Sequence, residues 1–516
     1  MERKKRHRKR GVIVYILVIM VSLFMILLHN LSGKSDIRWD EPLFVEESVK
    51  QLANGDTYYT PNSNHEAIDM ESCVIYYNNL IIVMTDHNFD ENERNKIAEL
   101  VNGEVVGVVN GAIHAFQIKV SESSLSQLRE LAKEIMKQPN VLYAGGEYPV
   151  QFMSTITDNN PWAISNDWSD LGNEIEPDGN DWWAEAIEAY TAWNYRHLCK
   201  DIKVGIIDNG YETQHEDLIG KVHLINQNSA ADHGTHVAGI IGAENNNVGI
   251  RGIVDFAQLY CADLWEDDSI ESRHTLLEYF TMMNNMIQNG TKVINNSWGA
   301  LWPEDRLSEA FVENRLNKGL RPTAEISIVM MAQLITSGYE NFIVVQAAGN
   351  GDDTYTGVDA RYSGFFCMID EGIYNHLPET TLSKLYESNI NYEMIEDRII
   401  IVGAVENLRD DKGNYYMTEF SNYGTTVDIC APGKDIYSTV TEESEFYTAM
   451  EGTSMAAPMV TGSVAYVWAL NPELTAGEVR EILLDGAIVK AISLEDGDNI
   501  VYPMLNLGNA VKKLCQ

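Results

Sequence analysis

Short apolar runs that end in turn residues recur through the second half of the chain and alternate with helical stretches. Examples are DIKVGIIDNG (201–210), KVINNSW (292–298), NFIVVQAAGN (341–350) and RIIIVGAV (398–405). Such runs predict buried strands, and their alternation with helices predicts an α/β fold with a parallel sheet covered on both faces. Ligands of such sheets bind at the carboxyl ends of the strands. We therefore expect functional residues at strand ends and helix starts.

One serine stands where such a site is expected. Ser454 lies in GTSMAAP, Gly452–Pro458, and an apolar helix follows as far as Asn471-Pro472. A hydroxyl in the first turn of a helix lies near unpaired backbone N–H groups, which stabilise negative charge. The plainer interpretation of such a serine is a helix cap. A catalytic interpretation needs a base, an acid that orients the base, and an oxyanion donor elsewhere in the chain.

Three further residues lie where a base, an orienting acid and an oxyanion donor are expected. Asp208 ends the apolar run VGIID, His233 opens the small-residue helix HGTHVAGIIGA, and Asn350 ends the run IVVQAAGN. Their plainer interpretations are a turn residue, a packed or capping histidine, and an Asx turn. His233 and His236 also have the i, i+3 spacing of a metal-binding pair, but no further cluster of ligands accompanies them.

Together these stretches resemble the subtilisin-family serine proteases, the subtilases. The strings that carry the resemblance are VGIIDNG (204–210), HGTHVAG (233–239), NNSWG (295–299), AAGN (347–350) and GTSMAAP (452–458). Their order, Asp before His before Ser, separates this family from the chymotrypsin-like and α/β-hydrolase orders. The resemblance implies a catalytic domain over 181–516, folded as a subtilisin-like three-layer sandwich with a mostly parallel central sheet. It also implies insertions at 300–342 and 351–396.

The resemblance implies a serine endopeptidase that acts through an acyl-enzyme intermediate on protein or peptide substrates. Ser454 is then the nucleophile, and His233 is the general base and later the general acid. Asp208 fixes the tautomer of the imidazole. The side-chain amide of Asn350 and the backbone N–H of Ser454 would bind the oxyanion.

Substrate-binding residues are implied in the same way. Ser297, Trp298 and Gly299 match the strand that pairs with an extended peptide, and Gly349 joins them beside the oxyanion donor. Trp298 is larger than the aliphatic residue often found there, so it either reshapes the subsites or belongs to the core. The acidic stretch at 351–353 places carboxylates near the expected primary pocket, which would favour basic residues.

The resemblance also implies a structural Ca²⁺ site. Asp217 matches the family's acidic ligand, and ENNNVGI (244–250) matches its calcium loop. The implied ligands are the side chains of Asp217 and Asn246 and the carbonyls of Glu244, Val248 and Ile250. Oxygen ligands suit Ca²⁺. The plainer interpretation is a polar hairpin with a glycine at positive φ.

A smaller domain is predicted before the catalytic one. Strand and helix patterns over 73–150 follow the order β-α-β-β-α-β, which is a ferredoxin-like α+β plan. By resemblance, residues 73–153 are the family's inhibitory propeptide, which also assists folding and whose last strand extends into the active site. Self-processing would then fall near Phe152–Thr155. Residues 154–180 would be a linker.

The N-terminus predicts a membrane anchor. A basic tail at 1–10 precedes eighteen uncharged residues at 11–28, GVIVYILVIMVSLFMILL. A helix of this length spans on the order of 27 Å, and the basic tail favours a cytoplasmic N-terminus. A cleaved signal peptide has the same pattern, but no small-x-small site follows, so an uncleaved signal anchor is favoured. Residues 29–72 would be a polar stalk, and the rest extracellular, released from the anchor if processing separates the two parts.

Composition excludes some function classes. The net charge of −39 argues against nucleic-acid binding, which needs basic surface. The six cysteines show neither CxxC pairs nor regular spacing, so no disulfide framework is predicted.

Two other functions stay open. One is a pseudoprotease-like binding module at the cell surface, which would have no use for the complete set of Asp208, His233, Ser454 and Asn350. The other is a serine esterase or amidase, which the peptide-binding string NNSWG disfavours.

Overall fold

The computed structural model describes residues 48–69, 74–150, 181–264, 274–299, 321–352, 355–364, 366–493 and 500–515. They belong to one compact unit, Glu47–Gln516. The predicted basic tail at 1–10, the anchor at 11–28, the processing site near 152–155 and the linker at 154–180 lie outside the described residues. Within the described ranges, no helix is both long and apolar enough to span a bilayer.

Residues 181–515, which we term the C-terminal lobe, are built around one mixed sheet. Its strands, in spatial order, are β10 (Val222–Leu224), β11 (Gln258–Asp263), β9 (Lys203–Asp208), β12 (Val293–Asn296), β13 (Ile343–Ala347), β14 (Ile399–Arg409), β15 (Tyr415–Met417), β19 (Lys490–Ile492) and β20 (Val501–Pro503), with β16 (Ile429–Pro432) paired to β14. Pairing is parallel from β10 to β14, but β14–β15 and β19–β20 are antiparallel. The antiparallel edge arises because the chain reverses after β14 in a tight turn, in which Gly413 N–H donates to Asp410 O at 3.0 Å.

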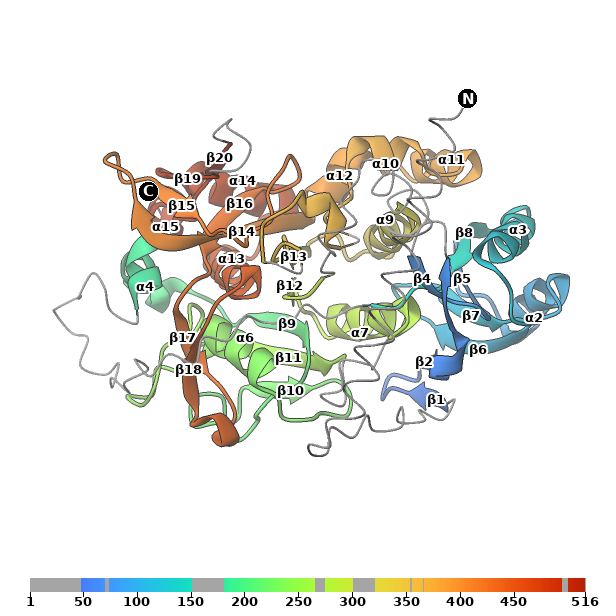
Figure 1. Ribbon diagram of the computed structural model, residues 1–516, viewed down its shortest axis with the longest axis horizontal. Coiled ribbons are helices and arrows are strands. Elements are labelled where there is room, and N and C mark those ends of the chain that lie inside the picture. The colour runs from blue at the N-terminus through green and yellow to red at the C-terminus, as the bar shows by residue number, and fades with distance from the viewer. Residues whose placement is uncertain are drawn as a thin grey trace, which may run out of the picture. The chain divides into compact units, whose positions relative to one another are not determined.

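Helices cover both faces of this sheet (Figure 1). Helices α13 (Thr453–Leu470) and α6 (Asp232–Gly242) pack against each other on one face, whereas α7 (Leu276–Gln288) and α9 (Arg321–Thr336) lie on the other. The predicted three-layer α/β architecture is therefore present. The lobe is completed by α4 (Trp182–Ala186), α5 (Ala189–Trp193), η3 (Arg196–Leu198), η6 (Ala360–Tyr362), α10 (Glu371–Asn375), α11 (Glu379–Glu387), α12 (Tyr392–Glu396), β17 (Ile436–Thr439), η7 (Glu442–Ser444), β18 (Tyr447–Met450), α14 (Ala476–Gly486) and α15 (Leu507–Cys515).

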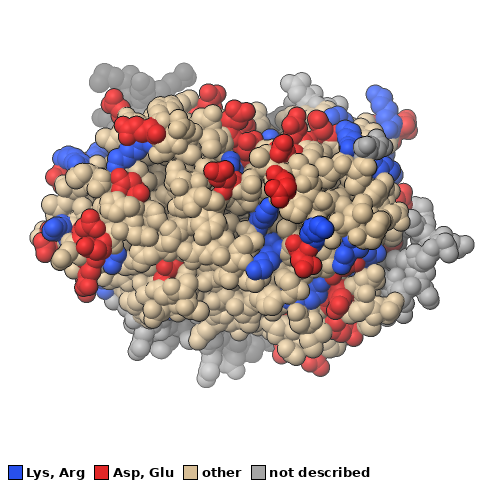
Figure 2. Space-filling view, turned by 180° about the vertical axis from the view of Figure 1, so that it is seen from behind, with Lys and Arg blue, Asp and Glu red and all other residues tan. Residues whose placement is uncertain are grey.

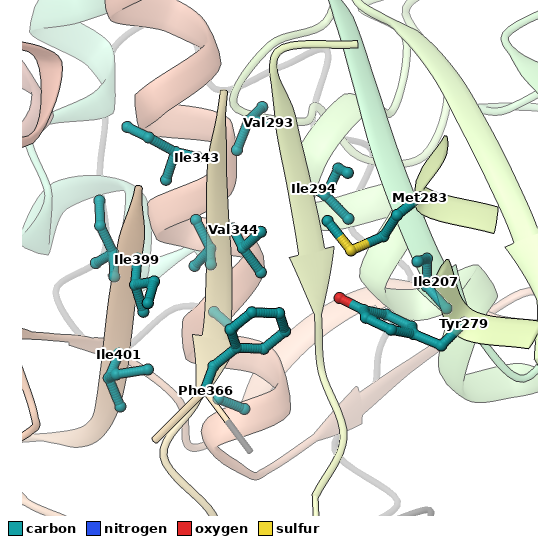
Figure 3. Packing of buried hydrophobic residues seen from close by; sticks show 14 of the residues in the cluster. Ile207, Tyr279, Met283, Val293, Ile294, Ile343, Val344, Phe366, Ile399 and Ile401 are labelled. Carbon is teal, nitrogen blue, oxygen red and sulfur yellow. The ribbon is translucent and has the colours of Figure 1, made fainter. Parts of the chain in front are cut away.

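The core lies between the sheet and these helices. Figure 3 shows Tyr279 and Met283 of α7 pointing toward Ile207 and Ile294 of the sheet, and all four side chains are fully buried. Helix α13 is buried on every side from its first turn, as expected for a mainly apolar helix at the centre of a domain. The serine predicted to be catalytic, Ser454, therefore lies in the first turn of a helix that is buried throughout.

Residues 48–150, which we term the N-terminal lobe, form a second sheet. Its strands, in spatial order, are β1 (Ser48–Gln51), β2 (Thr57–Thr60), β6 (Glu104–Val109), β7 (Ala115–Lys119), β5 (Leu80–Thr85) and β8 (Val141–Gly146). With α2 (Glu91–Leu100) and α3 (Leu125–Met136), the elements β5 to β8 follow the predicted β-α-β-β-α-β order. Capping boxes at Asp90 and Ser124 start the two helices.

The predicted stalk at 29–72 is wrong for residues 48–69. Strands β1 and β2 pair with each other, β2 joins the sheet through the pair Thr57–Val108, and β3 (Glu66–Asp69) pairs with β4 (Val74–Tyr77). Asp56 between β1 and β2 is only 2% exposed and accepts the Asn110 N–H at 2.9 Å. The sequence does not reveal these strands because each has only four residues and lies between polar turn residues.

Most charged residues are at least partly exposed, but some carboxylates, among them Asp56, Asp208 and Asp217, are buried. Figure 2 shows acidic side chains along the upper rim of one face, with acidic and basic side chains mixed over the rest of it.

Candidate active site

The carboxyl ends of three neighbouring strands bring the candidate residues together. Asp208 is the last residue of β9, Ser297 follows β12, and Asn350 follows β13 by three residues. These strands lie side by side in the order β9-β12-β13, all parallel. The site thus lies where ligands of parallel sheets bind.

His233 and Asp208 form a buried pair. Nδ1 of His233 lies 2.5 Å from Oδ1 of Asp208, and the side chains are 3% and 0% exposed. Oδ1 of Asp208 also accepts the Asn209 N–H at 2.9 Å. An ionised carboxylate only accepts, so this contact assigns the ring proton to Nδ1 and leaves Nε2 as the basic nitrogen.

The turn after β9 is fastened to the first turn of α6. Oδ1 of Asn209 accepts the Gly234 N–H at 3.0 Å. A Cβ on Gly234 would lie 2.2 Å from the carbonyl oxygen of Gly210, so only glycine fits. This close approach of α6 to the end of β9 is what places His233 beside Asp208.

Ser454 lies in the first turn of α13, and its side chain is fully buried. Its hydroxyl donates to the carbonyl oxygen of Ser297 at 2.9 Å, and the Ser297 hydroxyl donates to the Ser454 carbonyl oxygen at 2.8 Å. Gly452 precedes the helix at φ 150°, with Asn350 Nδ2 3.1 Å from where its Cβ would lie. The side chain of Asn350, the predicted oxyanion donor, therefore lies beside Gly452, two residues before the predicted nucleophile Ser454.

The side chain of Asn350 is oriented by Thr453. Oδ1 of Asn350 accepts both the Thr453 N–H and the Thr453 hydroxyl at 2.8 Å, and Thr453 Oγ1 in turn accepts the Gly349 N–H at 3.1 Å. This network assigns the amide orientation. Nδ2 of Asn350 is buried and has no hydrogen-bond partner among the described residues. A buried, preoriented donor of this kind suits a charge that develops only during reaction.

Sequence reasoning missed Asn422, which is fully buried behind this loop. Its Oδ1 accepts the N–H groups of Gly351 at 3.0 Å and Val358 at 2.9 Å, and its Nδ2 donates to Ala348 O at 3.0 Å. These bonds fix the backbone on either side of Asn350. The only local signal is an Asn-Tyr-Gly turn, which is not specific. Thr453 could have been proposed as a site residue from the sequence, since it lies in the GTSMAAP string.

The predicted substrate-binding residues follow strand ends as expected, but the Trp298 side chain belongs to the core. It is 1% exposed, packs edge-on against Tyr279 at 5.4 Å, and donates from Nε1 to Ile207 O at 3.0 Å. Ser297 and Gly299 remain beside it at the end of β12. Gly349 has φ 109°, and a Cβ there would lie 2.1 Å from Ser363 Oγ, so glycine is required.

The His236 side chain is bonded elsewhere than the Asp208–His233 pair. Its Nε2 donates to the carbonyl oxygen of Ile436 at 2.9 Å, and burial lowers its pKa to about 3. Among the described residues no group of three or more His, Cys, Asp or Glu side chains could hold a metal ion. The metal-pair interpretation of His233 and His236 therefore finds no support.

The predicted calcium residues surround one buried carboxylate. Oδ2 of Asp217 accepts the Ile250 N–H and the Tyr447 hydroxyl, both at 2.9 Å, while Oδ1 has no partner among the described residues. Oδ1 of Asn246 accepts the Val248 N–H at 3.0 Å within the same loop. Burial raises the pKa of Asp217 to about 7. Glu244 is exposed on the loop.

Comparison with known proteins agrees with this geometry. The sequence model of the subtilase family, peptidase S8, matches residues 199–507, more than half of the chain. Subtilisin DY of Bacillus licheniformis is 27% identical over 289 residues, 55% of this chain and 82% of the relative. The minor extracellular protease Epr of Bacillus subtilis (strain 168) is 25% identical over 359 residues, 68% of this chain and 44% of the relative.

A solved structure supports the fold. Fervidolysin from Fervidobacterium pennivorans, a keratinolytic enzyme related to subtilisin, superposes with a TM-score of 0.59 at 21% identity. The match covers 90% of this chain and 65% of that one.

Proposed function

Because the chain belongs to the subtilase family, it is a serine protease of the subtilisin type, and we propose that it cleaves proteins through Asp208, His233 and Ser454. The observation that carries the proposal is the buried contact of 2.5 Å between His233 Nδ1 and Asp208 Oδ1. It lies at the strand edge where Ser454 begins a helix. Asn350 supplies an oriented donor at the same edge.

Catalysis starts when the Ser454 hydroxyl turns from the Ser297 carbonyl to Nε2 of His233. Oγ then attacks the peptide carbonyl carbon, and its proton passes to Nε2. Asn350 Nδ2 and the Ser454 N–H bind the resulting oxyanion. The imidazolium, stabilised by Asp208, gives the proton to the leaving amine, and water repeats the sequence to release the acid from Ser454.

The test is peptide hydrolysis by two matched serine variants of one helix. Ser454→Ala removes the proposed nucleophile and should lower kcat about 10⁶-fold, as the equivalent change does in subtilisin. Ser463→Ala is the control, because the Ser463 hydroxyl only donates to Met459 O at 2.8 Å within α13. Equal activity of the two variants would refute the triad.

The N-terminal lobe is the inhibitory propeptide in this proposal. The Val150 N–H donates to His274 O at 2.8 Å, so the end of the lobe pairs with the chain just before α7. Asn284 of α7 accepts the N–H groups of Ala112 and Ile113, both at 3.1 Å. Self-cleavage near residues 152–155 would free the active site. A Ser454→Ala chain that is processed like the wild type would contradict self-cleavage.

A structural Ca²⁺ fits the donors near Asp217. Asp217 Oδ1 is a buried carboxylate oxygen without a partner in the part of the chain that the structure describes, and the remaining ligands would be Asn246 and the carbonyls of Glu244, Val248 and Ile250. The ion would keep Asp217 ionised and fasten the 244–250 loop. It takes no part in the bond cleavage.

We place the protease outside the cell, held by a membrane helix at 11–28. The support is the uncharged run behind a basic tail and the extracellular relative. After self-cleavage, contacts between the two lobes would alone connect the protease to that helix. Intact chain in membranes, with no fragment that begins near residue 154, would contradict this arrangement.

A further inference from the structure

The outer edge of the N-terminal sheet is held by a helix from the second predicted insertion. Strand β8 is the last strand in the spatial order of that sheet, and α11 packs against it. Building on the proposed function, we propose that the inserted segment 371–396 is a clamp that keeps the N-terminal lobe bound after the chain between the lobes is cut. The partner is thus the protein's own N-terminal lobe, retained as a second chain.

The inserted segment is a folded unit seated on the C-terminal lobe. Asp370 caps α10 by accepting the Ile373 N–H at 2.7 Å, and the Tyr374 hydroxyl donates to Ile390 O at 2.8 Å. Helices α10 and α12 pack against α9, which itself packs against β8 (Figure 1). Packing of α10 and α12 against α9 therefore fixes the position of α11 against β8.

One face of α11 makes the contact. Thr381 is fully buried, and its hydroxyl donates to Leu142 O of β8 at 2.5 Å. One turn on, Leu385 is 3% exposed, and Lys384 Nζ lies 3.5 Å from Asp86 Oδ2. Spacings of three and four residues put these side chains on the same helix face. The carbonyl of Leu142, on the edge strand, is thus paired by a side chain of the opposite lobe.

This contact lies outside the catalytic machinery. None of its side chains bonds to Asp208, His233 or Ser454 in any described contact. The same strand is also held by α9, where the Tyr143 hydroxyl donates to Glu325 Oε2 at 3.1 Å. Strand β8 is therefore contacted by two helices of the C-terminal lobe, and neither contact depends on the chain between the lobes.

The experiment separates retention from the protein's own activity. The full chain carries Ser454→Ala, an affinity tag at its N-terminus, and a sequence for an added site-specific protease within 154–180. After complete cutting in detergent, the chain is captured by the tag, and release of the C-terminal lobe is followed at one fixed pH. Because the added protease makes the cut, the result does not depend on the proposed triad or on self-cleavage.

Three variants define the outcome. Thr381→Val keeps the shape but removes the donor, and should release the lobe about five- to tenfold faster, the effect of one buried hydrogen bond. Thr381→Ser restores the hydroxyl and should behave as the parent, as should Thr380→Val on the exposed side of α11. Equal release by Thr381→Val and Thr381→Ser overturns the clamp. So does immediate release of the parent chain.

Discussion

Glu147 makes the contact between the two lobes sensitive to pH. The side chain is fully buried, its Oε1 accepts Gln117 Nε2 at 2.8 Å, and its Oε2 accepts the Leu276 N–H at the start of α7 at 3.0 Å. Burial raises the pKa of Glu147 from 4.5 to about 7, and the nearby Glu278 adds to the rise. Separation of the lobes removes the Leu276 N–H and Glu278 from Glu147, and we expect the pKa of Glu147 to fall toward its ordinary value.

The direction of the effect follows from this difference. The bound state holds the proton more tightly than the separated state, so binding is strongest below about pH 4.5 and weakens as the pH rises through about 7. A rise of the Glu147 pKa from 4.5 to about 7 corresponds to about 3 kcal/mol, or at most a few hundredfold in the affinity between the lobes. Alkaline conditions should therefore favour release of the N-terminal lobe.

The assay follows release of the cut lobes from about pH 5 to pH 8 in the Ser454→Ala background. The carboxylate of Glu278, which contributes to the raised pKa of Glu147, has its Oε2 2.8 Å from His274 Nδ1. Glu147→Gln isolates the Glu147 contribution, because it keeps an acceptor but cannot ionise. We expect this variant to lose most of the acceleration with pH, whereas Glu130→Gln, at a side chain 72% exposed, should keep it. The same pH slope in Glu147→Gln and in the parent would show that Glu147 does not cause the pH dependence.

Three further predictions concern the C-terminal lobe. Asn350→Ala should lower kcat about 10²–10³-fold with little change in KM, the extent known for the equivalent donor of subtilisin; steady-state kinetics check it, and an unchanged kcat would exclude the donor role. Added Ca²⁺ should raise the melting temperature of the parent and not that of Asp217→Asn, and equal responses would remove Asp217 from the ligand set. Asn422→Ala should lower the free energy of unfolding by about 1–3 kcal/mol for each N–H left unpaired at Gly351 and Val358. Urea unfolding measures this loss, and kcat should fall with it. Wild-type stability would show that Asn422 does not hold the loop.

The sequence predicted the layout of the C-terminal lobe because its signals are local. Apolar runs that stop at Asp208 and Asn350 mark strand ends, and parallel strands gather such ends at one edge. The small residues after His233 and Ser454 mark helices that approach the sheet closely. The three layers and the position of the site follow from these patterns.

Local sequence patterns do not predict contacts between distant parts of the chain. Asn422 braces the Asn350 loop from the far side, and Thr381 meets Leu142 from an insertion with no local pattern for it. The sequence does not decide whether the Trp298 side chain lines a subsite or belongs to the core. Its burial and the bond from its indole to Ile207 O on the neighbouring strand place it in the core. The strands at 48–60 were missed because segments of four residues carry too little periodicity.

The central claim is that Ser454 is a nucleophile activated by His233. The most direct measurement treats the processed protein with a fluorophosphonate and locates the adduct by mass spectrometry of its peptides. We expect one adduct on the Ser454 hydroxyl, absent in Ser454→Ala, strongly reduced in His233→Ala and unchanged in Ser463→Ala. An adduct on another residue, or labelling of Ser454 that does not depend on His233, would contradict it.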